Sequence, residues 1–172
     1  MSLRVPVTPE DHIQGEPQAA VTLIEYGDYQ CPSCGAAYPV VKRLQQYFGL
    51  DLCFVFRNFP LTEVHPQAQL AAETAEFSGA HGYFWQAHDA LFENQEALGL
   101  PLYVELIREL GLSGGELRQA LDEKRYRARV RTDFSGGVRS GVNGTPTFFI
   151  NGRRHDAAFD FHTLGEAIEA YR

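Results

Sequence analysis

The chain has 172 residues, of which 44% are hydrophobic and 12% aromatic, and its formal net charge is −7. These values indicate one folded domain, because globular domains commonly hold about 100–150 residues and disordered chains are poor in aromatic residues. The acidic balance argues against a nucleic-acid partner, since negative charge repels phosphate backbones. We interpret the one basic stretch, residues 116–139, as the solvated face of a helix. No apolar run approaches the ~20 residues of a membrane-spanning helix, so no membrane insertion is expected.

The start of the chain lacks the apolar region of a signal peptide. We therefore expect a cytoplasmic protein, or a periplasmic or otherwise extracytoplasmic one if a leader has been removed. We also expect a monomer. The 3 cysteines are too few for a disulfide-dense secreted scaffold, so the C-x-x-C pair of Cys31 and Cys34 is the feature to explain.

The first third of the chain predicts a strand, a helix and a second strand. Residues 21–26 form a β-rich run, and apolar residues then recur at three- and four-residue steps over 34–48. Gly49 suits the position just after a helix end, and residues 52–56 are again rich in strand formers. This order predicts a parallel βαβ unit, with the two cysteines at the start of its helix.

An all-helical block is predicted over about 62–140. Pro66 and Pro101 suit first helical turns, and Gly79 and Gly111 suit positions just after helix ends. Within the block, Ser113 is expected to cap a helix, residues 84–92 to form a buried helix face, and the arginines of the last helix to face away from its apolar side. That apolar side recurs every fourth residue, as Tyr126, Val130, Phe134 and Val138.

The end of the chain predicts two strands and a helix. Residues 147–150 are strand-like, Asn151-Gly152 is a typical hairpin turn, residues 153–155 return, and residues 161–171 form a helix. The predicted order is therefore βαβ, helical block, ββα.

The spacing of Cys31 and Cys34 points to redox chemistry. Residues three apart at a helix start lie on one face, and the unpaired N–H groups there favour a thiolate on the first cysteine. A half zinc site and a chance pair remain as alternatives, although the 6 histidines show no ligand-like spacing. Other candidates have structural explanations: Cys53 as an unreactive strand thiol, Asp28 as a loop acid, and Trp85 and His88 as core residues.

Three further features accompany the pair. Glu25 stands in an apolar strand six residues before Cys31, Pro39 interrupts the helix eight residues after Cys31, and a Gly144-Thr145-Pro146 turn precedes the strand of residues 147–150. Together with the helical block, they make the chain resemble the DsbA-like branch of the thioredoxin-fold disulfide oxidoreductases. The resemblance implies an α/β thioredoxin fold (βαβ…ββα) over residues 1–172, with a helical insertion at about 62–140.

The resemblance also implies how the site is built. Thr145–Pro146 would be a cis peptide beside the redox pair, and the backbone of Thr145 would pair with an extended substrate peptide. Glu25 would be a buried acid beneath the cysteines. Pro32, Ser33, Tyr29 and Val142 would line the substrate surface. No metal and no cofactor are expected.

The resulting functional hypothesis is a thiol:disulfide oxidoreductase. Cys31 would form a mixed disulfide with protein substrates, Cys34 would resolve it, and Glu25 would exchange a proton with Cys34. A redox partner would recycle the pair. Alternatives are a cytosolic disulfide or peroxide reductase that uses a low-molecular-weight thiol, and a non-catalytic redox-sensing binding module. Strongly oxidising members of the family carry a histidine where this chain has Ser33.

Overall fold

The computed structural model describes residues 1–172 and centres on a five-stranded sheet with the order β1-β3-β2-β4-β5. The strands β2 and β3 are parallel, and every other neighbouring pair is antiparallel. Their bounds are β1 (His12–Gly15), β2 (Val21–Gly27), β3 (Leu52–Asn58), β4 (Thr147–Ile150) and β5 (Arg153–His155). The parallel pair and the closing hairpin confirm the predicted βαβ and ββ units.

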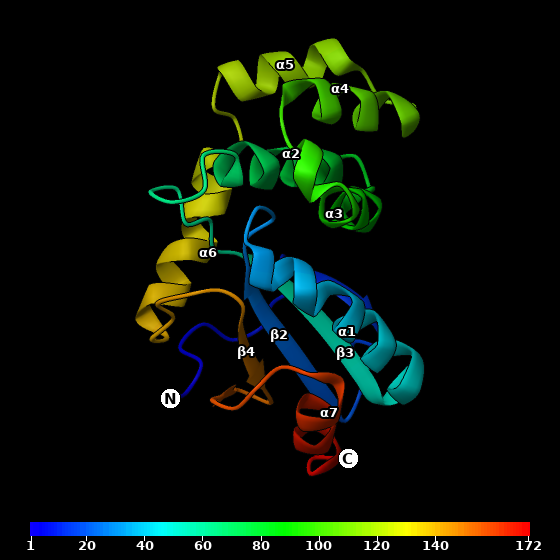
Figure 1. Cartoon of the computed structure of the whole chain (residues 1–172), viewed down its shortest axis with the longest axis vertical. Helices are drawn as coiled ribbons and strands as arrows, with labels where there is room; N and C mark the ends of the chain where they lie inside the picture. Colours follow the sequence, from blue (N-terminus) through cyan, green and yellow to red (C-terminus); the bar gives the residue numbers. More distant parts are fainter.

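Two helices cover one face of the sheet (Figure 1). They are α1 (Pro32–Phe48), which contains Pro39, and α7 (Phe161–Glu169), and both lie where the sequence predicts helices. Gly49 follows α1 with a φ of 52°, and the short helix η1 (Gly49–Asp51) leads into β3. The opposite face packs under the N-terminal segment and α6, around buried Ile24, Val55 and Phe149.

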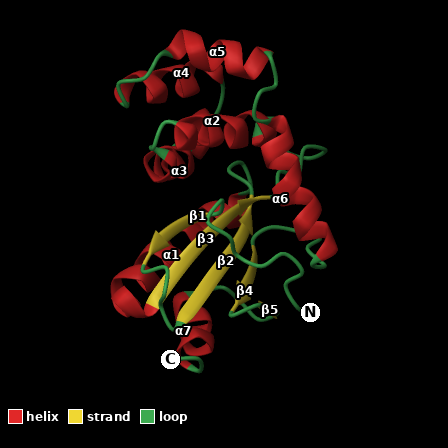
Figure 2. Cartoon of the chain, turned by 180° about the vertical axis from the view of Figure 1, so that it is seen from behind, coloured by secondary structure: helices red, strands yellow, loops and turns green.

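The helices between β3 and β4 extend beyond one end of the sheet (Figure 2). Helices α2 and α3 lie next to the sheet, α4 and α5 stack outside them, and α6 runs back toward the sheet. Their bounds are α2 (Ala68–Ala80), α3 (Phe84–Glu93), η2 (Gln95–Ala97), α4 (Leu100–Glu109), α5 (Gly114–Asp122) and α6 (Arg127–Arg139). No helix is both long enough and apolar enough to cross a membrane.

Two of the predicted helix boundaries in this block are wrong. Pro66 precedes the cap residue of α2, and Gly79 lies inside that helix. The helix ends instead in a Schellman motif: the N–H of Tyr83 donates to the carbonyl of Ser78 at 2.8 Å, and Gly82 has a φ of 87°. The predictions for Ser113, which caps α5, and for Gly111, which has a φ of 77°, are confirmed.

The predicted apolar face of α6 is also partly wrong. Val138 is 54% exposed, because the helix turns Gly137 toward the sheet. A Cβ at Gly137 would lie 2.8 Å from the ring of Phe59, so only glycine permits this approach. On the same helix Arg129 does not face away but pairs with Asp133 at 2.7 Å.

The edge strand β1 has no counterpart in the sequence prediction. It comprises only four residues, His12–Gly15, and pairs antiparallel with β3. Its sequence lacks the alternation of apolar and polar residues that identifies a half-buried strand. The residue just before β1, Asp11, is held by the side chain of Arg57 in β3.

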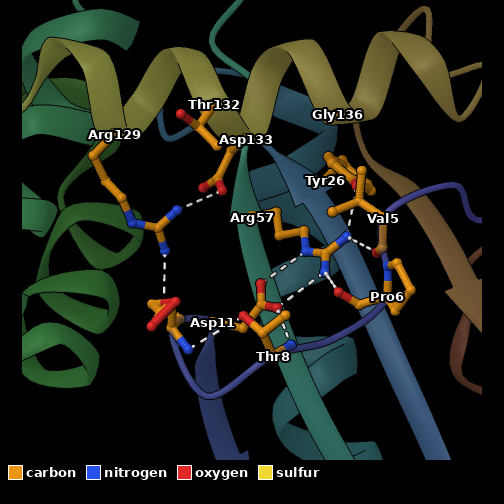
Figure 3. A pocket seen from close by; sticks show the side chains of 11 residues that line it. Val5, Pro6, Thr8, Asp11, Tyr26, Arg57, Arg129, Thr132, Asp133 and Gly136 are labelled. Atoms are coloured by element: carbon orange, nitrogen blue, oxygen red, sulfur yellow. Dashed lines mark hydrogen bonds and ion pairs between the residues drawn. The ribbon is translucent and has the colours of Figure 1, made fainter.

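Arg57 anchors the N-terminal segment through a buried network (Figure 3). Its guanidinium donates to both carboxylate oxygens of Asp11 at 2.8 and 3.0 Å, to the carbonyl of Val5 at 2.8 Å and to the hydroxyl of Tyr26 at 2.8 Å. The Arg57 side chain is only 3% exposed. The residues around this network line a pocket of about 170 Å³ that contains neither cysteine of the C-x-x-C pair.

Replacing Arg57 by Met is expected to lower the free energy of unfolding by about 3–5 kcal/mol, because it leaves the charge of Asp11 buried without its partner. Urea unfolding measures this loss. The double variant Arg57→Met, Asp11→Asn removes the orphaned charge and should recover part of it. A loss below about 1 kcal/mol, the value of an exposed ion pair, would show that the network is not buried in solution.

Candidate active site

Cys31 and Cys34 lie where the chain passes from β2 into α1. This junction is near the end of the sheet that faces α2 and α3 (Figure 1). Cys31 is the cap residue of α1, Pro32 is its first residue, and Cys34 lies in its first turn. Both cysteines are free thiols. Cys31 is 7% exposed and Cys34 is fully buried, so of the two only Cys31 reaches the surface.

The local structure separates the acidities of the two thiols. The hydrogen bond from the Cys34 thiol, with further help from the side chain of Thr145 and from the N–H groups of Cys34 and Ser33, lowers the pKa of Cys31 to about 5, although burial acts in the opposite direction. Burial and the hydrogen bond to Cys31 raise the pKa of Cys34 well above 9. At neutral pH the pair therefore consists of a nucleophilic thiolate and a protonated thiol.

Glu25 lies in the middle of β2, opposite Phe56 of β3 and Phe148 of β4. Its side chain is 2% exposed, and Oε2 has no hydrogen-bond partner. Burial, together with the charge of Cys31, raises the pKa of Glu25 to about 8. Such a carboxyl group can take up or release a proton close to neutral pH.

The loop before β4 brings Thr145 and Pro146 to the cysteines. The Thr145–Pro146 peptide bond is cis, and the Thr145 carbonyl lies 3.5 Å from the Cys31 sulfur, from which it accepts a hydrogen bond while Cys31 is protonated. Thr145 and Pro146 are half-buried, while Pro32 and Ser33 are exposed on the first turn of α1.

The other two predicted surface residues, Tyr29 and Val142, are not at the surface. Tyr29 is 1% exposed, because its ring packs against Phe92 of α3 and its hydroxyl bonds Nδ1 of His88 at 2.9 Å. Val142 is 4% exposed and belongs to the core on the opposite face of the sheet, with Phe149. The prediction that these two residues line the substrate surface is therefore wrong.

The residues predicted to be structural are buried or packed. His88 is 3% exposed and surrounded by aromatic rings, and Cys53 is buried in β3, where burial raises its pKa. Trp85 donates its indole N–H to the carbonyl of Ile13 at 3.1 Å. No group of three or more His, Cys, Asp or Glu side chains is placed to hold a metal ion.

Two side chains hold the loop between β2 and α1, residues 28–31, which is called the cysteine loop below. The sequence did not predict this role for either of them. Asp28 is fully buried and binds the N–H of Leu61 at 2.9 Å and Nδ1 of His65 at 2.8 Å, which ties the cysteine loop to the loop after β3. Gln95 reaches the cysteine loop from η2. Neither residue belongs to a recognisable sequence motif, and the contacts by which they join separate segments are to residues far away in the chain.

Comparisons with known proteins agree with this geometry. Residues 7–170 match the family model described as Thioredoxin. BdbD from Bacillus subtilis superposes with a TM-score of 0.85 at 26% identity, over 94% of this chain and 92% of that one. DsbA2 from Pseudomonas aeruginosa superposes with a TM-score of 0.74, also at 26% identity, over 97% of both chains.

Curated relatives match over nearly the whole of this chain but over little of their own length. A protein named Na(+)/H(+) antiporter NhaA 1 from Salinispora arenicola is 42% identical, over 98% of this chain and 26% of its own length. One named Na(+)/H(+) antiporter NhaA from Herminiimonas arsenicoxydans is 38% identical, over 100% and 27%. The chain thus spans about a quarter of the length of these relatives. The predicted α/β fold with its helical insertion is confirmed, and the chain belongs to the thioredoxin family, on its DsbA-like branch.

Proposed function

We propose that the chain exchanges a Cys31–Cys34 disulfide with the thiols and disulfides of other proteins. The observation that carries this proposal is the contrast within the pair: Cys31 is slightly exposed with a pKa lowered to about 5, and Cys34 is buried with a raised pKa. A single accessible thiolate next to a protonated thiol suits ordered, two-step exchange.

When a substrate disulfide is reduced, the Cys31 thiolate attacks one of its sulfurs. The substrate S–S bond breaks, one substrate thiolate leaves, and a mixed disulfide forms on Cys31. In the mixed disulfide Cys31 no longer carries the negative charge that helps to raise the pKa of Glu25, which favours ionisation of that carboxyl group. Cys34 then loses its proton to ionised Glu25 and attacks the Cys31 sulfur, which releases the second substrate thiolate and leaves a Cys31–Cys34 disulfide. Two electrons pass to the substrate. Oxidation of a substrate dithiol is the same sequence in reverse, and a redox partner restores the starting state.

The loop around Thr145 is the proposed contact for the substrate backbone. An extended peptide whose cysteine meets Cys31 would lie beside Thr145 and Pro146, with Pro32 and Ser33 as its other neighbours. Because Tyr29 and Val142 are buried, they have no place in this surface.

The reduction potential of the pair tests the proposal. The protein, carrying Cys53→Ser, is equilibrated in glutathione and dithiothreitol buffers, and its free thiols are counted after alkylation. The lowered pKa of Cys31 favours the reduced form, so we expect a two-electron couple between the ~−270 mV of thioredoxin and the ~−120 mV of DsbA. If no disulfide forms between Cys31 and Cys34 in any buffer, the proposed function is wrong.

A second candidate is a redox-sensing module that acts on a membrane protein. It is favoured by the match to about a quarter of proteins named Na(+)/H(+) antiporter. A sensor would form the Cys31–Cys34 disulfide reversibly but would not turn over protein substrates. Multiple turnovers of a disulfide-bonded protein such as insulin would therefore decide for the oxidoreductase.

A further inference from the structure

Gln95 connects the helical insertion to the backbone of the cysteine loop. It is the first residue of η2, between α3 and α4, and its Nε2 donates to two carbonyl oxygens, that of Tyr29 at 2.8 Å and that of Cys31 at 2.9 Å. A side-chain amide has two N–H donors, so these bonds use both of them. The two carbonyls lie on either side of the Gln30–Cys31 peptide bond, just before α1 begins at Pro32.

Gly35 gives a second, independent observation on the Gln95 amide, because the amide packs directly against this glycine. A Cβ at Gly35 would overlap Oε1 of Gln95, so one of the two groups would have to move. Gly35 lies in the first turn of α1, and its own N–H donates to the same Cys31 carbonyl at 3.0 Å. Glycine is unfavourable inside a helix, yet here it leaves the space that the Gln95 amide occupies.

A second contact from the insertion holds the neighbouring residue. The Tyr103 hydroxyl of α4 donates to Oε1 of Gln67 at 2.9 Å, and the N–H of Gln67 donates to Oε1 of Gln30 at 2.6 Å. Residues 29–31 are therefore held by side chains and backbone from outside the thioredoxin half of the chain.

We propose that Gln95 is a positioning residue for Cys31: it fixes the loop backbone so that the N–H groups of the first turn of α1 point at the Cys31 sulfur. The inference rests on the proposed function, in which the Cys31 thiolate is the nucleophile. Gln95 touches neither the sulfur nor the substrate in this role. It acts through the Cys31 carbonyl, which fixes the start of α1; because the next residue, Pro32, has no N–H, the groups so directed are the N–H groups of Ser33 and Cys34.

The test is the pKa of Cys31, measured by the pH dependence of its alkylation rate in protein that carries Cys53→Ser. We expect Gln95→Ala to raise this pKa by about one unit, which lowers the thiolate fraction below the midpoint about tenfold. Gln95→Glu should raise it further, because a carboxylate accepts rather than donates and adds negative charge. Asn94→Ala is the matched control: Asn94 bonds the Ala90 carbonyl at 2.8 Å, and its loss should leave the pKa unchanged.

Gly35→Ala tests the same contact from the other side. We expect it to displace the Gln95 amide and to raise the Cys31 pKa as Gln95→Ala does, whereas adding Gly35→Ala to Gln95→Ala should have no further effect. If Gln95 only fills space, its replacement will change the unfolding midpoint and leave the pKa of Cys31 where it was, and the inference is overturned. Alkylation does not require turnover, so this result is independent of whether the exchange function itself holds.

Discussion

Replacing Cys31 by Ser is expected to lower the rate of insulin disulfide reduction on the order of 10³-fold or more, down to the rate without protein. The reason is that the Cys31 sulfur is the accessible one of the pair and the one whose pKa is lowered, to about 5. A serine hydroxyl at this position is neither ionised near neutral pH nor able to form a disulfide. The rate is followed as the precipitation of insulin chains in the presence of dithiothreitol.

Two further cysteine variants serve as controls for this loss. Cys53→Ser should retain the wild-type rate, because Cys53 is buried in β3 away from the pair. Cys34→Ser should still react once at Cys31 but fail to release the product. Activity of Cys31→Ser close to that of the wild type would exclude Cys31 as the attacking group.

Replacing Glu25 by Gln is expected to remove a large pH dependence of stability from the reduced protein. The pKa of Glu25 is raised from 4.5 to about 8, so between these values the folded chain keeps a proton that the unfolded chain has lost. Stability then falls as pH rises, by about 1.4 kcal/mol per pH unit and by roughly 5 kcal/mol in all. Below pH 4.5 both states are protonated and this cost is absent.

The measurement compares urea unfolding of the wild type and Glu25→Gln at pH 5 and pH 9, under reducing conditions. Glutamine is also buried and polar, but its cost is the same at both pH values, so the change in the difference between the two proteins isolates ionisation. We expect Glu25→Gln to gain on the wild type by several kcal/mol at the higher pH. An equal pH dependence in both proteins would mean that Glu25 is not a buried acid with a raised pKa.

Local sequence signals predict the elements that carry the chemistry. The C-x-x-C spacing places Cys31 and Cys34 at the start of α1, the isolated acid of a strand identifies Glu25, and Asn151-Gly152 marks the hairpin between β4 and β5. In each case a few neighbouring residues determine the backbone geometry, so the signal is complete within a short window.

The residues that were misplaced or missed depend on contacts between distant segments. Periodicity does not reveal that aromatic side chains of α3 cover Tyr29, or that Val142 joins the core beneath the N-terminal segment and α6. Likewise, the amide of Gln95 is an ordinary polar side chain until folding brings it to the carbonyls of Tyr29 and Cys31. Such roles appear only when the helical insertion is docked on the sheet.

The most direct test of disulfide exchange at Cys31 is to trap the mixed disulfide. Protein with Cys34→Ser and Cys53→Ser is incubated with a disulfide-linked peptide pair near pH 7, and the product is mapped by mass spectrometry after digestion. We predict one peptide per protein, joined to Cys31, and no comparable adduct on Cys34 in protein with Cys31→Ser and Cys53→Ser. The absence of an adduct on Cys31, or equal trapping by Cys34, would contradict the proposed mechanism.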